Sequence, residues 1–173
     1  MTTYVALLRA VNVGGTGKLP MSDLVAMCEA ACFEHPRTCI ASGNVVFASR
    51  ASDALVQAAL QAELARYAGK PVGVLLRSAT QMAQVLRDNP FADALPERTA
   101  AIFLDRAPAP DALDGIKGRA DEQIALGVRE IYVRYGVAGI GQSKLKIALA
   151  AQGTARNMNT AAKLAAMAAA LNA

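Results

Sequence analysis

The chain has 173 residues, of which 54% are apolar and 18% are charged, and its formal net charge is +4. This composition excludes an intrinsically disordered chain, and the length is typical of one modest domain or of two small halves that share a core. The mild positive charge favours anionic partners, but no block of lysine and arginine residues marks a nucleic-acid surface.

We expect neither a targeting segment nor a membrane span. Residues 1–13 are apolar but short, and they lack both a basic start and a small-residue cleavage pattern, so no signal peptide is predicted. No run of about 18 apolar residues is free of charge, which is the length that a membrane-spanning helix needs. We therefore expect a cytoplasmic protein whose thiols stay reduced.

Residues 1–77 predict the order strand, helix, strand, strand, helix, strand. Ser42 and Gly43 separate the two middle strands, because glycine permits the positive φ of a tight hairpin. We expect Ser52 to cap the second helix and Gly69 to end it. The expected strands are 3–9, 37–41, 44–48 and 72–76, and the expected helices are 22–31 and 53–68.

The second half of the chain repeats part of this order. Ser78 and Gln81 form a capping box that opens a helix, and the helix must stop before Pro90. The other expected helices are 108–118, 143–153 and 159–171, and the expected strands are 99–105, 123–126 and 130–134.

The element order predicts an α+β fold built from two ferredoxin-like halves, residues 1–77 and 78–173. In the split β-α-β, or ferredoxin-like, unit the helices cover one face of an antiparallel sheet. The second half carries an extra C-terminal helix. Similar four-residue runs begin at Ile40 and Ile124, and either a degenerate duplication or chance accounts for them.

A glycine-rich segment follows the first strand and precedes the first helix, an arrangement that presents backbone N–H groups to an anion. It matches neither phosphate-binding motif, because Leu19 replaces the magnesium-binding Ser or Thr of a Walker A loop and Pro20 replaces the third glycine of a dinucleotide fingerprint. We predict an anion or nucleotide-phosphate site here, with a plain linking loop as the alternative. Its candidate residues are Arg9, Asn12, Gly14, Gly15 and Lys18.

A second group of polar residues surrounds the start of the last helix. Arg156 precedes this helix and Lys163 lies one turn into it, which also makes a place for an anion. Asn157 or Asn159 would either orient the ligand or cap the helix. Our hypothesis is that this group and the glycine-rich segment face a common cleft.

Motifs along the chain carry a resemblance to a known family. They are residues 4–18, Met21 with Leu24, Ser42–Phe47, Asn89–Phe91, Ser143–Leu145 and Thr154–Thr160. In this order they resemble the bacterial family catalogued as domain of unknown function 1697. The resemblance implies two α/β halves of ferredoxin-like character and no chemistry. Ser42 and Asn44 of the predicted hairpin are further candidate ligand-binding residues. Met158 stands where that family usually has Trp.

Other site types have weaker support. Cys28, Cys32, His35 and Cys39 are zinc-ligand types, but they lack a metal-knuckle spacing and the first two lie on or near the apolar side of a helix, so no metal is predicted. No acid-base pair is marked among the scattered carboxylates, and whether the protein is an enzyme stays open.

We expect the protein to bind a small anionic, phosphate- or nucleotide-like ligand, without a cofactor. The alternative is a nucleic-acid or protein-partner binding module that uses a mildly basic face. Single-stranded RNA recognition on the sheet would need aromatic platforms, and the predicted strands offer Tyr4 and Phe47 for that role. The sequence does not determine the ligand or the oligomeric state.

Overall fold

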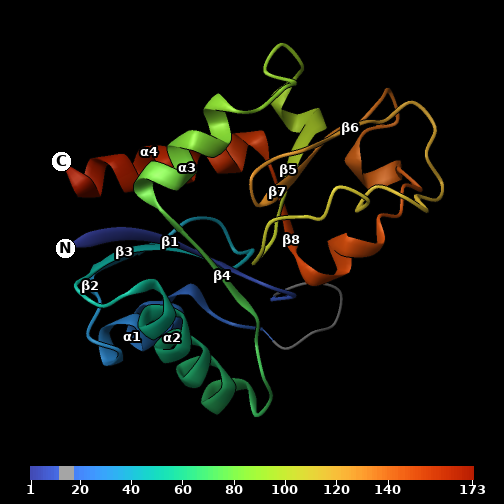
Figure 1. Cartoon of the computed structure of the whole chain (residues 1–173). Coiled ribbons are helices and arrows are strands. Elements are labelled where there is room, and N and C mark those ends of the chain that lie inside the picture. Colours follow the sequence, from blue (N-terminus) through green and yellow to red (C-terminus); the bar gives the residue numbers. More distant parts are fainter. Residues whose placement is uncertain (12–17) are drawn as a thin grey trace. The chain divides into compact units, whose positions relative to one another are not determined.

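The computed structural model describes residues 1–11 and 18–173 (Figure 1). The chain divides into two compact units: Met1–Met82 with Leu164–Ala173 form the first, and Ala83–Lys163 form the second. These units differ in extent from the predicted halves, because the halves are defined by a repeated strand order and the units by contacts.

The first unit contains a four-stranded sheet in which every neighbouring pair of strands is antiparallel. The strand order is β2-β3-β1-β4, so the first strand lies between two strands that come later in the chain. This is the ferredoxin-like arrangement that the element order predicts. Its elements are β1 (Thr2–Leu8), α1 (Met21–Ala30), β2 (Glu34–Thr38), β3 (Asn44–Ser49), α2 (Asp53–Ala68) and β4 (Val74–Ser78).

Helices α1 and α2 cover one face of this sheet (Figure 1). Alternate residues of β1, namely Tyr4, Ala6 and Leu8, point into the core beneath the helices, as the two-residue period of a strand requires. The Tyr4 hydroxyl donates to the Ala51 carbonyl at 3.0 Å and contacts an Asp53 carboxylate oxygen at 2.9 Å, so the polar tip of this buried ring is satisfied.

Two ends of the chain belong to the first unit. Thr3 of β1 lies within hydrogen-bonding distance of Asn172, near the end of α4 (Met158–Asn172), with 3.4 Å between the side-chain oxygens Oγ1 and Oδ1. Residues 164–173 belong to the first unit, and Asn172 among them contacts the first strand of the chain.

The second unit contains another antiparallel sheet, of order β6-β7-β5-β8, which is the order of the first sheet again. The predicted α+β fold with two ferredoxin-like halves is therefore confirmed. The further elements are α3 (Ala79–Arg87), η1 (Pro96–Arg98), β5 (Thr99–Phe103), β6 (Gln123–Leu126), β7 (Glu130–Arg134), η2 (Ile140–Gln142), η3 (Ala148–Gln152) and β8 (Thr154–Asn157).

Three local predictions for the second half are wrong. The predicted helix over 108–118 is a series of turns, because Gly115 and Gly118 have φ values of +74° and +68°, which a right-handed helix does not accept. The predicted helix over 143–153 is reduced to the short 3₁₀ turn η3. Residues 154–157, for which no strand was predicted, form strand β8.

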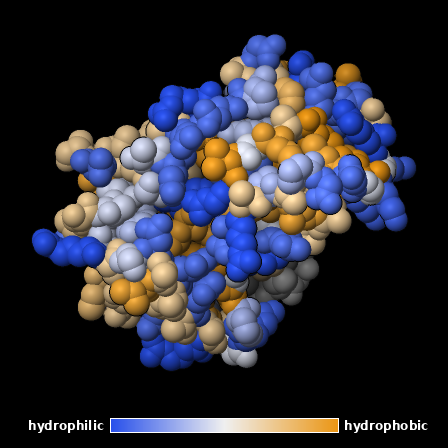
Figure 2. Space-filling model, viewed as in Figure 1, coloured by the Kyte–Doolittle hydropathy of each residue, from blue (hydrophilic) through white to orange (hydrophobic). Residues whose placement is uncertain are grey.

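Loops, rather than helices, cover one face of the second sheet. Lys117 and Lys146 exchange backbone hydrogen bonds of 3.1 and 2.8 Å, which join two of these loops. Apolar side chains remain only half-buried here, and they gather over β6 and the neighbouring loops in the space-filling view (Figure 2). The half-buried aliphatic residues of this cluster are Leu113, Ile116, Ile124, Leu126, Leu145 and Leu149.

The predicted capping box and the hairpin glycine are present. The Ser78 N–H donates to Gln81 Oε1 at 2.8 Å, and the Gln81 N–H donates to Ser78 Oγ at 3.2 Å, which satisfies two backbone donors at the start of α3. Gly43 turns the β2–β3 hairpin with a φ of +79°.

Gly43 and Gly69 provide a matched pair for separating backbone strain from steric overlap. An added Cβ at Gly43 would lie 2.9 Å from Leu8 Cβ, whereas one at Gly69, with a similar φ of +70°, would meet nothing within 4 Å. We expect Gly69→Ala to lower the free energy of unfolding by about 1 kcal/mol and Gly43→Ala to lower it by about 2–4 kcal/mol. Urea unfolding of both variants measures the difference, and equal losses would contradict the overlap with Leu8.

Candidate functional site

Arg9 and Lys18 flank the predicted anion loop, and Asn12, Gly14 and Gly15 lie outside the described residues. The Arg9 N–H donates to the Gly73 carbonyl at 2.9 Å, just before β4. The aliphatic part of Arg9 passes over Gly73, where an added Cβ would lie 2.8 Å from Arg9 Cδ. The absence of a side chain at Gly73 thus allows the half-buried Arg9 to lie flat beside β4.

A hollow of about 310 Å³ in the first unit, which we call the lysine hollow, is lined in part by Ala10, Val11 and Lys18. Two cationic residues line it, and they come from the segment before α1 and from the segment after α2. Much of the remaining wall is apolar. The residues that matter for its chemistry are Lys18, Leu19, Leu64, Tyr67, Lys70 and Val72.

Tyr67 connects the wall of the lysine hollow to α1. Its hydroxyl donates to an Asp23 carboxylate oxygen at 3.1 Å and lies 3.5 Å from the Lys18 carbonyl oxygen. The pKa of Tyr67 is raised, mainly by desolvation and secondly by the hydrogen bond to Asp23. The hydroxyl therefore keeps its proton at neutral pH and holds the end of α2 against the start of α1.

Ser42 and Asn44 serve the β2–β3 hairpin. The Asn44 amide donates to the Cys39 carbonyl at 2.9 Å and to Ser42 Oγ at 3.0 Å, and the Asn44 side chain is fully buried. Because these contacts span the turn, they fix the hairpin in which both residues lie. A ligand-binding role for these two candidates stays a prediction.

Arg156 lies on β8 in the second unit. Its Nη1 donates to Thr154 Oγ1 at 2.7 Å and to the Ala155 carbonyl at 2.9 Å. Burial lowers the pKa of Arg156 to about 10, so the guanidinium stays charged at neutral pH although water is largely excluded from it.

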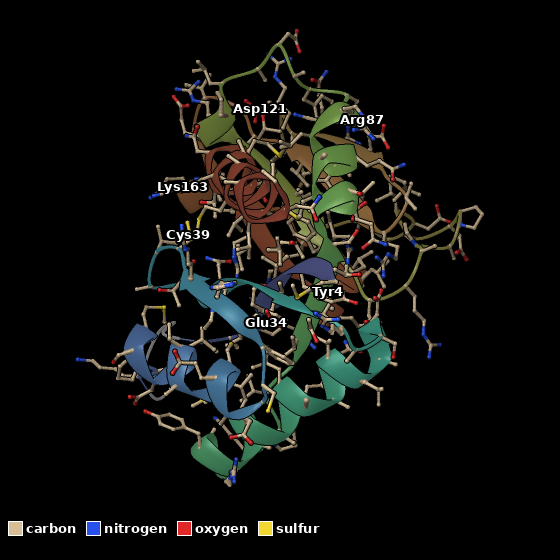
Figure 3. All side chains as sticks on the ribbon, turned by 90° about the vertical axis from the view of Figure 1, so that its left-hand side faces the viewer. Tyr4, Glu34, Cys39, Arg87, Asp121 and Lys163 are labelled. Atoms are coloured by element: carbon tan, nitrogen blue, oxygen red, sulfur yellow. The ribbon has the colours of Figure 1, made fainter. Side chains whose placement is uncertain are left out.

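The residues after Arg156 separate into a helix cap and two exposed positions. The Asn157 side-chain oxygen accepts a hydrogen bond of 2.9 Å from the Thr160 N–H, so Asn157 caps α4. Asn159 and Lys163 are exposed on α4, and Figure 3 shows Lys163 on this helix. The capping alternative thus holds for Asn157.

The predicted site residues fall into two groups. Arg9, Lys18, Ser42 and Asn44 belong to the first unit, and Arg156, Asn157, Asn159 and Lys163 belong to the second. The common cleft that the sequence suggested would need both groups, and it stays a prediction.

Sequence reasoning selected Arg156 and missed its counterpart, Arg77. Each arginine lies on the last strand of its ferredoxin-like half, and each is buried. Each Nη1 also donates to the carbonyl of the residue before it, Leu76 at 2.8 Å and Ala155 at 2.9 Å. The repeated strand order would have revealed this equivalence, but residues 154–157 were not predicted as a strand.

The zinc-type residues do not gather into a site. Within residues 1–11 and 18–173, no three His, Cys, Asp or Glu side chains form a group that would hold a metal ion. Cys28 lies in the core, where burial raises the pKa of its thiol to about 12, while Cys32 and His35 are exposed.

Comparisons with known proteins show the family and the fold. The family model described as "Protein of unknown function (DUF1697)" matches residues 1–132. A solved structure of conserved bacterial protein SP0830 from Streptococcus pneumoniae is 22% identical, with a TM-score of 0.80, and the match covers 98% of this chain and 99% of that chain. No curated protein matches the chain. Among the described residues, no helix combines the length and the apolarity that crossing a bilayer requires.

The two asparagines at the start of α4 should differ sharply in their effect on stability. We expect Asn157→Ala to lower the free energy of unfolding by about 1 kcal/mol, because it removes the cap on the Thr160 N–H. Asn159→Ala should change it by less than about 0.5 kcal/mol, since Asn159 is exposed. Denaturant unfolding measures both, and Asn157→Asp should restore the lost stability. A larger loss in Asn159→Ala than in Asn157→Ala would refute the assigned cap.

The three free cysteines should react with iodoacetamide at different rates. At about pH 8 we expect Cys32 to be alkylated at least tenfold faster than Cys28 in the folded protein. The raised pKa of Cys28 keeps its side chain protonated, and the protonated thiol does not react with iodoacetamide. Buried Cys39 should also react slowly. Peptide mass spectrometry measures the rates, with unfolded protein as the control in which all three react. Rapid labelling of Cys28 before unfolding would contradict its place in the core.

Proposed function

The chain belongs to the DUF1697 family of proteins of unknown function, and from that premise we propose that it binds a small ligand with a phosphate group on an apolar or planar body. The proposed site is the lysine hollow. The observation that carries the proposal is that Lys18 and Lys70 line the same hollow as the apolar side chains of Leu19, Leu64 and Val72.

The charges around the lysine hollow favour a doubly charged anion. Two ammonium groups attract a phosphate, which also accepts several of their hydrogen bonds. The nearby carboxylate of Asp23 and the partly negative C-terminal end of α2 oppose an anion. Because a single lysine would be offset by these groups, we expect both Lys18 and Lys70 to be needed.

The size and the wall of the hollow limit the rest of the ligand. A volume of about 310 Å³ lies at the lower end of the range for small-molecule sites. Leu19, Leu64 and Val72 offer an apolar surface on which a flat ring is able to pack. These features suit a mononucleotide or the phosphate ester of a similarly small molecule.

We also propose that the protein works in the cytoplasm. Cys28, Cys32 and Cys39 are free thiols, as a reducing compartment maintains them. A nucleic-acid or protein-partner module with a mildly basic face is the alternative function, and the dependence of affinity on salt separates it from a small site.

Adenosine 5′-monophosphate and inorganic phosphate are the probes for the proposed site. We expect titration calorimetry of the whole protein to show binding of the nucleotide, with phosphate weaker because it lacks the apolar body. The double variant Lys18→Gln/Lys70→Gln should weaken nucleotide binding at least about tenfold, since it removes both charges while leaving polar side chains only one atom shorter.

Lys117→Gln is the matched control, because Lys117 is exposed and lies in the second unit. Binding to this variant should equal binding to the unchanged protein. A double variant that binds the nucleotide normally would rule out the lysine hollow. Tight binding of a short oligonucleotide that falls steeply with salt, together with no binding of the mononucleotide, would favour the alternative function.

A further inference from the structure

The second unit contains a polar hollow of about 400 Å³ that no sequence motif indicated. It lies at the end of the second sheet where β5 and β6 begin and β7 ends. We call it the arginine hollow. The residues that define its chemistry are Arg98, Asp121, Gln123, Arg134, Gly136 and Val137.

Strand register brings the polar residues of the arginine hollow together. Thr99, Arg134 and Gln123 lie directly opposite one another on β5, β7 and β6, so they form one row across three strands. Neighbouring strands are about 4.8 Å apart. Arg98 is the last residue of η1, just before this row, and it lines the same hollow. Arg134 Nη1 donates to Gln123 Oε1 at 3.3 Å, so these two side chains lie on the same face of the sheet.

Gly136 makes room for the carboxylate of Asp121 in the wall. A Cβ added to Gly136 would lie 1.7 Å from Asp121 Oδ2, so no other residue fits at position 136 while Asp121 keeps its place. The Val137 N–H donates to the same oxygen at 3.3 Å. Figure 3 shows Asp121 at the end of the second unit that carries η1.

The arginine hollow therefore combines two guanidinium groups with one carboxylate. Among the residues that the structure describes, no ion pair joins Asp121 to Arg98 or to Arg134, so these charges are not neutralised by one another. A guanidinium group binds a carboxylate through two parallel hydrogen bonds, whereas a carboxylate attracts an ammonium group.

We propose that the arginine hollow binds a small zwitterion with two acidic groups and one ammonium group, the chemistry of an acidic α-amino acid. Arg98 and Arg134 take the two acidic groups, and Asp121 takes the ammonium group. A ligand with acidic groups alone would be repelled by the Asp121 carboxylate, because it would carry no positive group to pair with that charge. This site is separate from the lysine hollow and uses none of its residues.

Three probes of nearly equal size test the charge pattern in the whole protein. They are L-glutamate, glutarate without the ammonium group, and 4-aminobutyrate without the second acidic group. We expect titration followed by amide NMR to show L-glutamate binding at least about tenfold tighter than either analogue, with shifts at Gln123, Gly136 and Val137. Equal binding of glutarate and L-glutamate, or no shift with any probe, overturns the proposal.

Asp121→Asn gives a readout that a merely structural role would not produce. We expect it to weaken L-glutamate and to tighten glutarate, so that the preference between the two falls at least about tenfold. Arg98→Gln and Arg134→Gln should each weaken L-glutamate by about tenfold or more, while the exposed Arg106→Gln serves as the control with unchanged binding. Loss of both ligands to the same degree in a folded Asp121→Asn protein contradicts the assigned role of Asp121.

Discussion

In each unit the first strand pairs with two strands that come later in the chain, and the remaining architecture depends on this insertion. β1 lies between β3 and β4, and β5 lies between β7 and β8. Antiparallel pairing fixes which residues are neighbours across the sheet. It places Arg9 beside Gly73 in the first unit and Arg98 beside the end of β7 in the second. Strand pairing thereby places cationic residues such as Arg9 and Arg98 at the ends of the sheets, next to residues that are distant in the sequence.

The two units build their hollows by different means. In the first, two long helices pack on the sheet, and the lysine hollow forms where the end of α2 meets the start of α1. In the second, turns and 3₁₀ segments replace the crossover helices, so the arginine hollow is formed by strand ends and the short segments beside them. The first wall is consequently mainly apolar, and the second is mainly polar.

Local signals in the sequence predicted much of the fold. The capping box at Ser78, the hairpin at Gly43 and the helix end at Gly69 each depend on residues within one turn of one another, and all three are present. The helix predicted over 108–118 is absent because Gly115 and Gly118 take positive φ values, although Leu113 and Ile116 do pack on the second core as an apolar pattern suggests. Strand β8 was missed because its four residues, one of them Arg156, have no alternating apolar pattern.

Less of the candidate sites was predictable. Lys18 was selected because it ends a glycine-rich segment, but Lys70 has no local motif and joins Lys18 only through the packing of α2. Arg98, Asp121 and Arg134 are separated by more than 10 residues from one another, and they meet only through strand pairing and the hydrogen bond from the Val137 N–H to Asp121. Such sites follow from pairing across a sheet, which one sequence does not reveal.

The contact between Thr3 and Asn172 bears on how this chain tolerates rearrangement. Because the two residues lie 3.4 Å apart at their side-chain oxygens, a short glycine-rich linker is able to join residues 1 and 173 without disturbing the first sheet. New termini then fit in the exposed turns around Ala109 and Asp114, where few backbone groups are committed to the sheet. The order of the elements along this chain is therefore open to circular permutation.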